Sequence, residues 1–276
     1  MSSEKREEGP VERVEKVESV KKVERPERES PLPLVKTGIE GLDPIIGGGF
    51  IRGRTYLVAG ETGTGKTLFS LNYLVYGATV GEPGIYLLVD EDYEDFIKGA
   101  LAFGWDLEEL IKRNILSVLT LLPDFVEKMK DKPLETIVRS IVYSLKTEAA
   151  RIKAKRLVID PVAPLIMGEK DVTWTRGYIR NLVISIEKEI GTTNVITSEV
   201  PTGSNQLSRF GVEEFLAAGV IVLGLERVGT EYRRTLHVRK MRWRPVQPAT
   251  YFMEIVPGRG IVVKGKLEIP ARIPRR

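Results

Sequence analysis

The chain has 276 residues, a net charge of +4, one histidine and no cysteine. Without cysteine it forms neither disulfides nor thiolate ligands, and His237 alone cannot build a histidine-based metal site. The sequence contains no run of about 18 apolar residues and no apolar core near its start, so we expect no membrane-spanning helix, no secretory signal and a cytoplasmic protein. The modest net charge does not by itself indicate nucleic-acid binding.

Residues 1–33 differ in composition from the rest of the chain. They are rich in Glu, Lys, Arg and Val, contain several prolines and have no aromatic residue. Their valines recur every third residue between Val11 and Val23, a period that drifts around an α-helix and leaves no continuous apolar stripe. We therefore predict a disordered, charged arm; a helix that binds a protein partner is the alternative.

The folded part is expected to run from residue 34 to 264, followed by a basic tail at 265–276. Short apolar segments alternate with segments of helical period, which predicts a mostly parallel sheet covered by helices on both faces. The last two strands suggest an antiparallel, β-rich carboxyl end. The predicted strands are 56–59, 84–89, 115–121, 156–160, 194–198, 219–225, 234–241 and 251–263, and the main helices include residues 68–75, 96–103, 137–145 and 180–190.

Residues 54–70 combine an apolar strand, a glycine-rich turn and the start of a helix. The turn matches G-x-x-x-x-G-K-[ST] at every position: Gly60, Glu61, Thr62, Gly63, Thr64, Gly65, Lys66 and Thr67. Glycine lets several backbone N–H groups converge on phosphate oxygens, and the N-terminus of the following helix favours negative charge. Lys66 can reach the β- and γ-phosphates, and the Thr67 hydroxyl can ligate Mg²⁺. With Leu68, these residues predict a nucleoside triphosphate site; the strand before and the helix after argue against a chance match.

Two further carboxylate positions end predicted strands. Asp160 closes an apolar strand about a hundred residues after the phosphate loop, where an acid can hold Mg²⁺ directly or through water. Asp90 and Glu91 end the strand that follows the loop, and triphosphate hydrolysis needs a carboxylate that orients the attacking water. We favour Glu91 as the catalytic carboxylate and Asp90 as its auxiliary, while Asp92 can cap the next helix.

Several segments together resemble the KaiC-type module of the RecA/RadA superfamily. They are residues 37–78, 103–107, 210–215 and 234–242, in the order in which that family has them. The resemblance covers roughly residues 34–264 and implies a RecA-like P-loop ATPase core that binds ATP and Mg²⁺. It also implies rings, usually hexamers, with ATP between neighbouring subunits. Only one such module fits in this length, so the two-module arrangement of the circadian-clock KaiC is not carried over.

The resemblance assigns roles to particular residues. It implies a tandem acidic pair at Asp90 and Glu91, although most members have Glu first. The Lys-x-Arg pair, here Lys240 and Arg242, is expected to reach the γ-phosphate of the next subunit's ATP. Two long cations two residues apart on a strand face the same way, which permits that role; a solvated basic strand is the alternative. Ser198 stands where RecA-like ATPases place a polar residue that senses the γ-phosphate.

The sequence is compatible with two biological roles. One is a RadA-paralogue-type DNA recombination or repair accessory that binds single-stranded DNA, favoured by the cations at the carboxyl end. The other is a signalling or scaffold ATPase that binds proteins, with the charged arm as the candidate binding segment. The loop at 200–211, where RecA and RadA hold DNA, has one cation, Arg209, and one aromatic residue, Phe210, which is a poor match to a DNA groove. Ala217 and Ala218 also depart from relatives that have an acid before Gly219.

Overall fold

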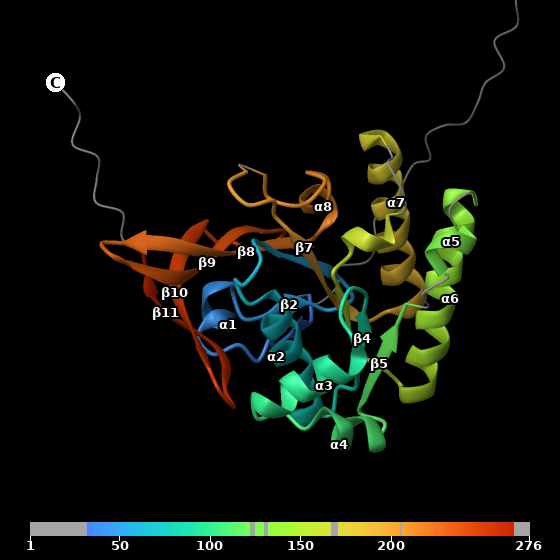
Figure 1. Ribbon diagram of the computed structural model, residues 1–276, viewed down its shortest axis with the longest axis horizontal. Helices are drawn as coiled ribbons and strands as arrows, with labels where there is room; N and C mark the ends of the chain where they lie inside the picture. The colour runs from blue at the N-terminus through green and yellow to red at the C-terminus, as the bar shows by residue number, and fades with distance from the viewer. Residues whose placement is uncertain (1–31, 122–124, 130–131, 167–170, 205, 268–276) are drawn as a thin grey trace, which may run out of the picture. The chain divides into compact units, whose positions relative to one another are not determined.

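The computed structural model describes residues 32–121, 125–129, 132–166, 171–204 and 206–267 (Figure 1). Residues 1–31 of the predicted arm and 268–276 of the predicted tail lie outside these ranges, and so do the tail cations Arg272, Arg275 and Arg276. In the part of the chain that is described, none of the helices has the length and apolar character needed to cross a membrane.

The centre of the fold is a nine-stranded sheet with the order β11-β10-β9-β8-β3-β7-β6-β4-β5. Strands β3 to β8 pair in parallel, whereas β8, β9, β10 and β11 pair antiparallel. The strands are β3 (Thr55–Gly60), β4 (Gly84–Leu88), β5 (Leu116–Thr120), β6 (Arg156–Asp160), β7 (Thr193–Glu199), β8 (Gly219–Val228), β9 (Glu231–Met241), β10 (Ala249–Val256) and β11 (Gly260–Lys266). A separate two-stranded sheet pairs β1 (Leu34–Val35) with β2 (Phe50–Ile51). The predicted parallel sheet with an antiparallel carboxyl end is confirmed.

Helices cover both faces of the sheet. They are α1 (Leu42–Ile45), α2 (Lys66–Thr79), α3 (Tyr93–Ala102), α4 (Leu107–Lys112), α5 (Phe125–Met129), α6 (Leu134–Ile152), α7 (Val172–Ser185) and α8 (Glu213–Leu216), with short 3₁₀ and π segments at Ala163–Leu165 and Ile186–Ile190. Figure 1 shows α2, α3 and α4 gathered apart from α6 and α7. The first group packs into one apolar core and the second into another. Successive strand residues serve the two cores in turn: Tyr56 and Val58 face the first, Leu57 and Ala59 the second.

Polar side chains fix where several helices begin. The Asp92 carboxylate accepts hydrogen bonds from the Glu94 and Asp95 amides at 2.9 and 3.2 Å, so the predicted cap of α3 is confirmed. Asp171 accepts from the Trp174 amide at 2.8 Å and starts α7 at residue 172. This helix begins earlier than the predicted 180, because the cap and the packing of Tyr178 extend it towards the N-terminus.

The strand register places the carboxyl ends of four strands at one edge of the sheet. Gly60 of β3 pairs with Glu199 of β7, and Leu88 of β4 pairs with Asp160 of β6. Each of these strands is followed by a loop, so this edge carries the phosphate loop and the predicted carboxylates together. In open parallel sheets ligands bind at this edge.

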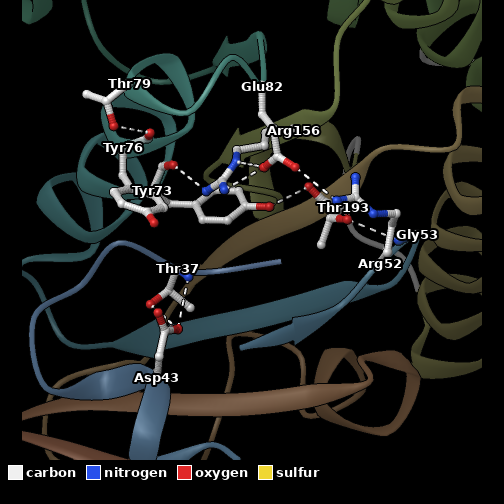
Figure 2. A network of polar contacts seen from close by, with 10 residues as sticks. All are labelled: Thr37, Asp43, Arg52, Gly53, Tyr73, Tyr76, Thr79, Glu82, Arg156 and Thr193. Atoms are coloured by element: carbon white, nitrogen blue, oxygen red, sulfur yellow. Dashed lines mark hydrogen bonds and ion pairs between the residues drawn. The ribbon is translucent and has the colours of Figure 1, made fainter. Parts of the chain in front are cut away.

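The opposite edge holds a buried arginine (Figure 2). Arg156 begins β6, is 1 % exposed, and donates to Glu82 Oε2 from Nε at 2.9 Å and from one terminal nitrogen at 2.6 Å. Its other terminal nitrogen donates to the Tyr73 carbonyl at 2.8 Å, and its guanidinium lies 4.4 Å from the centre of the Tyr73 ring. Burial alone would raise the pKa of the Glu82 carboxyl, but hydrogen bonds from Arg156 and Arg52 outweigh burial and lower that pKa.

Candidate functional site

A cavity of about 520 Å³ opens at the carboxyl edge of the parallel strands. It is lined by Thr62, Gly63, Gly65, Lys66, Thr67, Leu68, Leu88, Asp90, Glu91, Asp160, Pro161, Glu199, Arg234 and Ile255. The phosphate loop and the three predicted carboxylates, which come from three separate parts of the sequence, therefore surround one space.

The phosphate loop has the backbone that its glycines permit. Gly63 and Gly65 have φ of 80° and 105°, in the left-handed region that side chains disfavour. A Cβ on Gly60 would lie 2.5 Å from the Leu223 carbonyl oxygen, so this position has no room for a side chain. Among the predicted loop residues, Gly60, Glu61 and Thr64 do not line the cavity; the Thr64 hydroxyl donates to the Glu61 carbonyl at 2.8 Å and holds the turn.

Lys66 begins α2, and backbone carbonyl groups hold its side chain in place. Its ammonium donates to the carbonyl oxygens of Gly60 and Glu61, both at 3.0 Å. Burial lowers the pKa of this ammonium, while the charges of Glu199 and Asp160 act in the opposite direction. A triphosphate would exchange these two carbonyl partners for anionic oxygens, which bind an ammonium more strongly.

Asp160 is buried and oriented by two hydroxyl groups. Tyr86 OH donates to its Oδ2, and Thr197 Oγ1 donates to its Oδ1. Burial and the adjacent Asp160 charge raise the pKa of the Tyr86 phenol well above its ordinary value, so this group remains a donor. Asp160 is therefore fixed as an acceptor of two hydroxyl groups and lines the cavity, as Thr67 does.

Asp90 and Glu91 lie in a negative environment. Burial raises the pKa of the Asp90 carboxyl, and the charges of Glu199 and Asp160 raise it further. Burial and then the charges of Asp160 and Asp95 raise the pKa of Glu91. Carboxylates grouped closely enough that their charges raise the pKa of Asp90 and Glu91 favour a cation between them.

The donor set fits a magnesium ion that is shared with phosphate. Within the described residues, no group of three or more His, Cys, Asp or Glu side chains is arranged to hold a metal by itself. Mg²⁺ is commonly bound by one or two carboxylates, waters and substrate phosphates rather than by an all-protein cage. Thr67 and Asp160, the two predicted ligands, both line the cavity and are the residues that would hold it.

Ser198 occupies a different place from the one its predicted role requires. Register pairs Val58 with Thr197 and Ala59 with Ser198, so the two polar residues face opposite sides of the sheet. Ser198 does not line the cavity, and its hydroxyl donates to Glu213 Oε1 at 2.9 Å. In this segment Thr197 contacts Asp160 and Glu199 lines the cavity.

Lys240 and Arg242 lie away from this cavity. Arg234 of β9 lines it, and the six residue steps from Arg234 to Lys240 span about 20 Å along the strand. Lys240 pairs with Val220 near the start of β8, and Arg242 N donates to the Ala218 carbonyl at 2.8 Å, at the opposite edge of the sheet. Ala217 and Ala218, where relatives have an acid before Gly219, also lie at this edge. Both side chains are buried, so an acidic side chain in place of Ala218 would require the surrounding side chains to repack.

The sequence did not identify five residues that belong to the site in the structure. They are Glu199, Arg234 and Ile255, which line the cavity, and Tyr86 and Thr197, which position Asp160. Glu199 ends β7, but the polar residues Thr197 and Ser198 before it weaken the signal that identified Asp160, which follows three apolar residues. Arg234 and Ile255 reach the cavity because the antiparallel strands β9 and β10 lie beside the parallel ones, and no local pattern marks them.

Comparisons with known proteins agree with this geometry. The family model described as "ATPase: KaiC" matches residues 35–268. The circadian clock oscillator protein KaiC of Thermostichus vulcanus is 35 % identical over 241 residues, covering 86 % of this chain and 46 % of the relative. KaiC of Prochlorococcus marinus strain SARG is 38 % identical over 209 residues, covering 75 % and 41 %. The chain thus spans less than half the length of these curated relatives.

A solved structure is matched over its whole length. The crystal structure of a KaiC-like protein from the hyperthermophilic archaeon Pyrococcus horikoshii superposes with a TM-score of 0.72 at 35 % sequence identity. The match covers 85 % of this chain and all of that one. With the family model matched across nearly the whole described region, the chain belongs to the KaiC family of RecA-like P-loop ATPase domains.

Proposed function

We propose that this protein is a Mg²⁺-dependent ATPase that assembles head-to-tail, with each ATP completed by residues of a neighbouring subunit. The observation that carries the proposal is the single cavity into which Lys66, Thr67, Asp160 and Glu91 all project. These are the parts that triphosphate hydrolysis requires: a phosphate cradle, a metal position and a carboxylate for water.

The phosphate loop binds the triphosphate. Its amides and the N-terminus of α2 donate hydrogen bonds to the β-phosphate oxygens, and Lys66 leaves its carbonyl partners to contact the β- and γ-phosphates. Thr67 and Asp160 hold Mg²⁺, which neutralises charge on the phosphate oxygens. Tyr86 and Thr197 keep the Asp160 carboxylate in one orientation.

Glu91 orients the attacking water and accepts its proton as the oxygen bonds to the γ-phosphorus. The bond from that phosphorus to the bridging oxygen breaks, and ADP and inorganic phosphate are released. The raised pKa of Glu91 makes it a stronger base than an ordinary carboxylate, which suits proton transfer near neutral pH. Asp90 is the proposed auxiliary of Glu91 and lines the same cavity.

Lys240 and Arg242 supply positive charge to the next subunit's γ-phosphate. Their distance from the cavity of their own chain supports this assignment, because within one chain they would have no part in the site. Burial and the adjacent Arg242 lower the pKa of Lys240 to about 8, and a phosphate from a neighbour would raise it again. Repeated contacts of this heterologous kind close into a ring when the rotation allows, and we propose a hexamer.

The test is ATP turnover and assembled mass for the wild type, Glu91→Gln and Arg242→Ala. We expect Glu91→Gln to bind ATP and assemble while turnover falls by roughly 10²- to 10⁴-fold. Arg242→Ala should lose turnover by about 10³-fold with intact ATP binding. Undiminished turnover by Arg242→Ala in a strictly monomeric protein would exclude the shared site and leave a solitary nucleotide switch.

A second candidate function is binding of single-stranded DNA, as in RadA-type repair accessories. Trp243 favours it: this side chain is 80 % exposed and stands between Arg242 and Arg244, a combination suited to stacking on a base. Phe210 of the 200–211 loop packs against the second core instead. Binding of a fluorescent single-stranded DNA should weaken with salt and fall about tenfold in Trp243→Ala. No binding at low salt favours the alternative, a signalling or scaffold ATPase with a protein partner.

A further inference from the structure

Helix α8, Glu213–Leu216, connects two sets of residues that the proposed mechanism uses separately. At one end it contacts the strand that leads into the nucleotide cavity, and at the other it contacts Lys240 and Arg242. The helix has only four residues, so it has little rigidity of its own and depends on these contacts for its position.

The first contact is a buried carboxylate. Glu213 is fully buried, and its Oε1 accepts from Ser198 Oγ at 2.9 Å. Its Oε2 accepts from Ser208 Oγ at 2.7 Å and from the Val212 amide at 3.1 Å. The Ser208 hydroxyl also contacts Glu214 Oε2, so its one proton is shared between two carboxylates. A buried carboxylate held by these contacts fixes its surroundings, because movement would leave it without partners.

Ser198 links this cluster to the cavity. It lies in β7 between Thr197, whose hydroxyl donates to Asp160, and Glu199, which lines the cavity. The Arg209 amide also donates to Ser198 Oγ at 2.9 Å, so the loop that precedes α8 is fixed to the same strand. Glu213 therefore anchors α8 to the end of the strand beside the nucleotide.

The second contact orients the two cations. Lys240 Nζ donates to the Glu214 carbonyl at 2.6 Å, and a terminal nitrogen of Arg242 donates to the Phe215 carbonyl at 2.6 Å. Both acceptors belong to α8, directly after Glu213. Long cationic side chains have many rotamers, and these two carbonyls select one arrangement for each.

We propose that Glu213 is a positioning residue for the neighbouring subunit's active site: it fixes α8, and α8 presents Lys240 and Arg242. This inference rests on the proposed function, in which those cations act across a subunit interface. It assigns Glu213 no contact with substrate, and it predicts that loss of Glu213 harms the neighbour's site rather than its own.

Assemblies of two variants mixed together test whether Glu213 acts on the neighbouring subunit's site or on its own. Glu213→Ala alone should lower turnover by about 10²-fold, as expected when catalytic groups shift by about 1 Å, while the Kd for ATP is unchanged. Lys66→Ala alone should be inactive, because it cannot hold the phosphates, but it still presents intact cations. In an equimolar mixture, about a quarter of the interfaces pair a Glu213→Ala nucleotide site with Lys66→Ala cations, and turnover should recover accordingly.

The control mixture replaces Glu213→Ala with Arg242→Ala. Recovery in both mixtures supports the inference. Recovery with Arg242→Ala but not with Glu213→Ala means that Glu213 serves its own subunit, which overturns the inference and leaves the shared site intact. Recovery in neither mixture, with assembly demonstrated by mass, overturns the shared site itself.

Two further variants separate positioning from a general loss of structure. Glu213→Gln keeps the side-chain shape and an acceptor oxygen, so it should fold if Glu213→Ala does not and retain part of the turnover. Glu108→Ala removes an exposed glutamate from α4 and should behave as the wild type in every mixture. If Glu213→Gln and Glu213→Ala both keep full turnover, the inference is wrong.

Discussion

Strand β6 begins with Arg156 and ends with Asp160, and these two buried charges differ in how they are satisfied. Arg156 meets Glu82, the Tyr73 carbonyl and the Tyr73 ring, so its charge is balanced within the protein (Figure 2). Asp160 accepts from two hydroxyl groups, it and Glu199 act electrostatically on the Lys66 ammonium, and it raises the pKa of Asp90 and Glu91 nearby.

The difference separates a structural charge from a functional one. At the amino edge the ion pair is complete, and a ligand has nothing to add there. At the carboxyl edge four carboxylates, Asp90, Glu91, Asp160 and Glu199, line one cavity with two cations, Lys66 and Arg234, so added positive charge would be favourable there. Both kinds of charge are buried on one strand, so burial alone does not identify a site; the excess of carboxylates over cations does.

The largest expected effect is that of Asp160→Asn. We expect turnover to fall by at least about 10²-fold, because the metal position loses its carboxylate. The free energy of unfolding should change by no more than about 1 kcal/mol, because the amide retains an acceptor and a repulsive charge is removed. Turnover assays and urea unfolding measure the two quantities. A loss of stability as large as that of an Arg156 variant would contradict the comparison.

Arg156→Met should lower stability strongly and leave ATP binding intact, the reverse of what we expect for Asp160→Asn. Removing the guanidinium leaves Glu82 and the Tyr73 carbonyl without their buried partner, and breaking a buried pair costs about 3–5 kcal/mol of unfolding free energy. ATP binding by the folded protein should be unchanged. Arg52→Met is the matched control: Arg52 contacts the other oxygen of Glu82 but is 42 % exposed, so its loss should cost less than about 1 kcal/mol.

The smallest expected effect is on the pH dependence of stability. Asp90 and Glu91 have ordinary pKa values of about 3.9 and 4.3, and folding raises both. At pH values between the ordinary and the raised pKa of each group, the folded state binds more protons than the unfolded state. Stability contributed by these groups is therefore present at low pH and is lost as pH rises through that window. Urea unfolding measured from pH 4 to 7 checks the sign.

Asp160→Asn provides the control for this pH effect. Because the Asp160 charge is one cause of both shifts, its removal should shrink the loss of stability with rising pH. An unchanged slope in Asp160→Asn would show that desolvation alone sets the two pKa values.

The sequence predicted the elements whose signals are local. The phosphate loop, the acids after two apolar strands and the cap at Asp92 each depend on residues close together in the chain. The parallel direction of the core strands was predicted from their alternation with helices. The earlier start of α7 was missed because its first turns are set by the Asp171 cap and by packing onto the second core rather than by a clear period.

Other features depend on contacts between distant segments, and only the tertiary structure decided them. Register turned Ser198 towards Glu213 and left Thr197 facing Asp160, although both residues are polar and adjacent. The antiparallel strands brought Arg234 and Ile255 to the cavity and carried Lys240 to the far edge. The sequence by itself determined which chemical groups follow which strands, because those signals are local. Which groups meet, and on which face, was decided by strand register and by the packing of α8, because both depend on contacts made across the whole sheet.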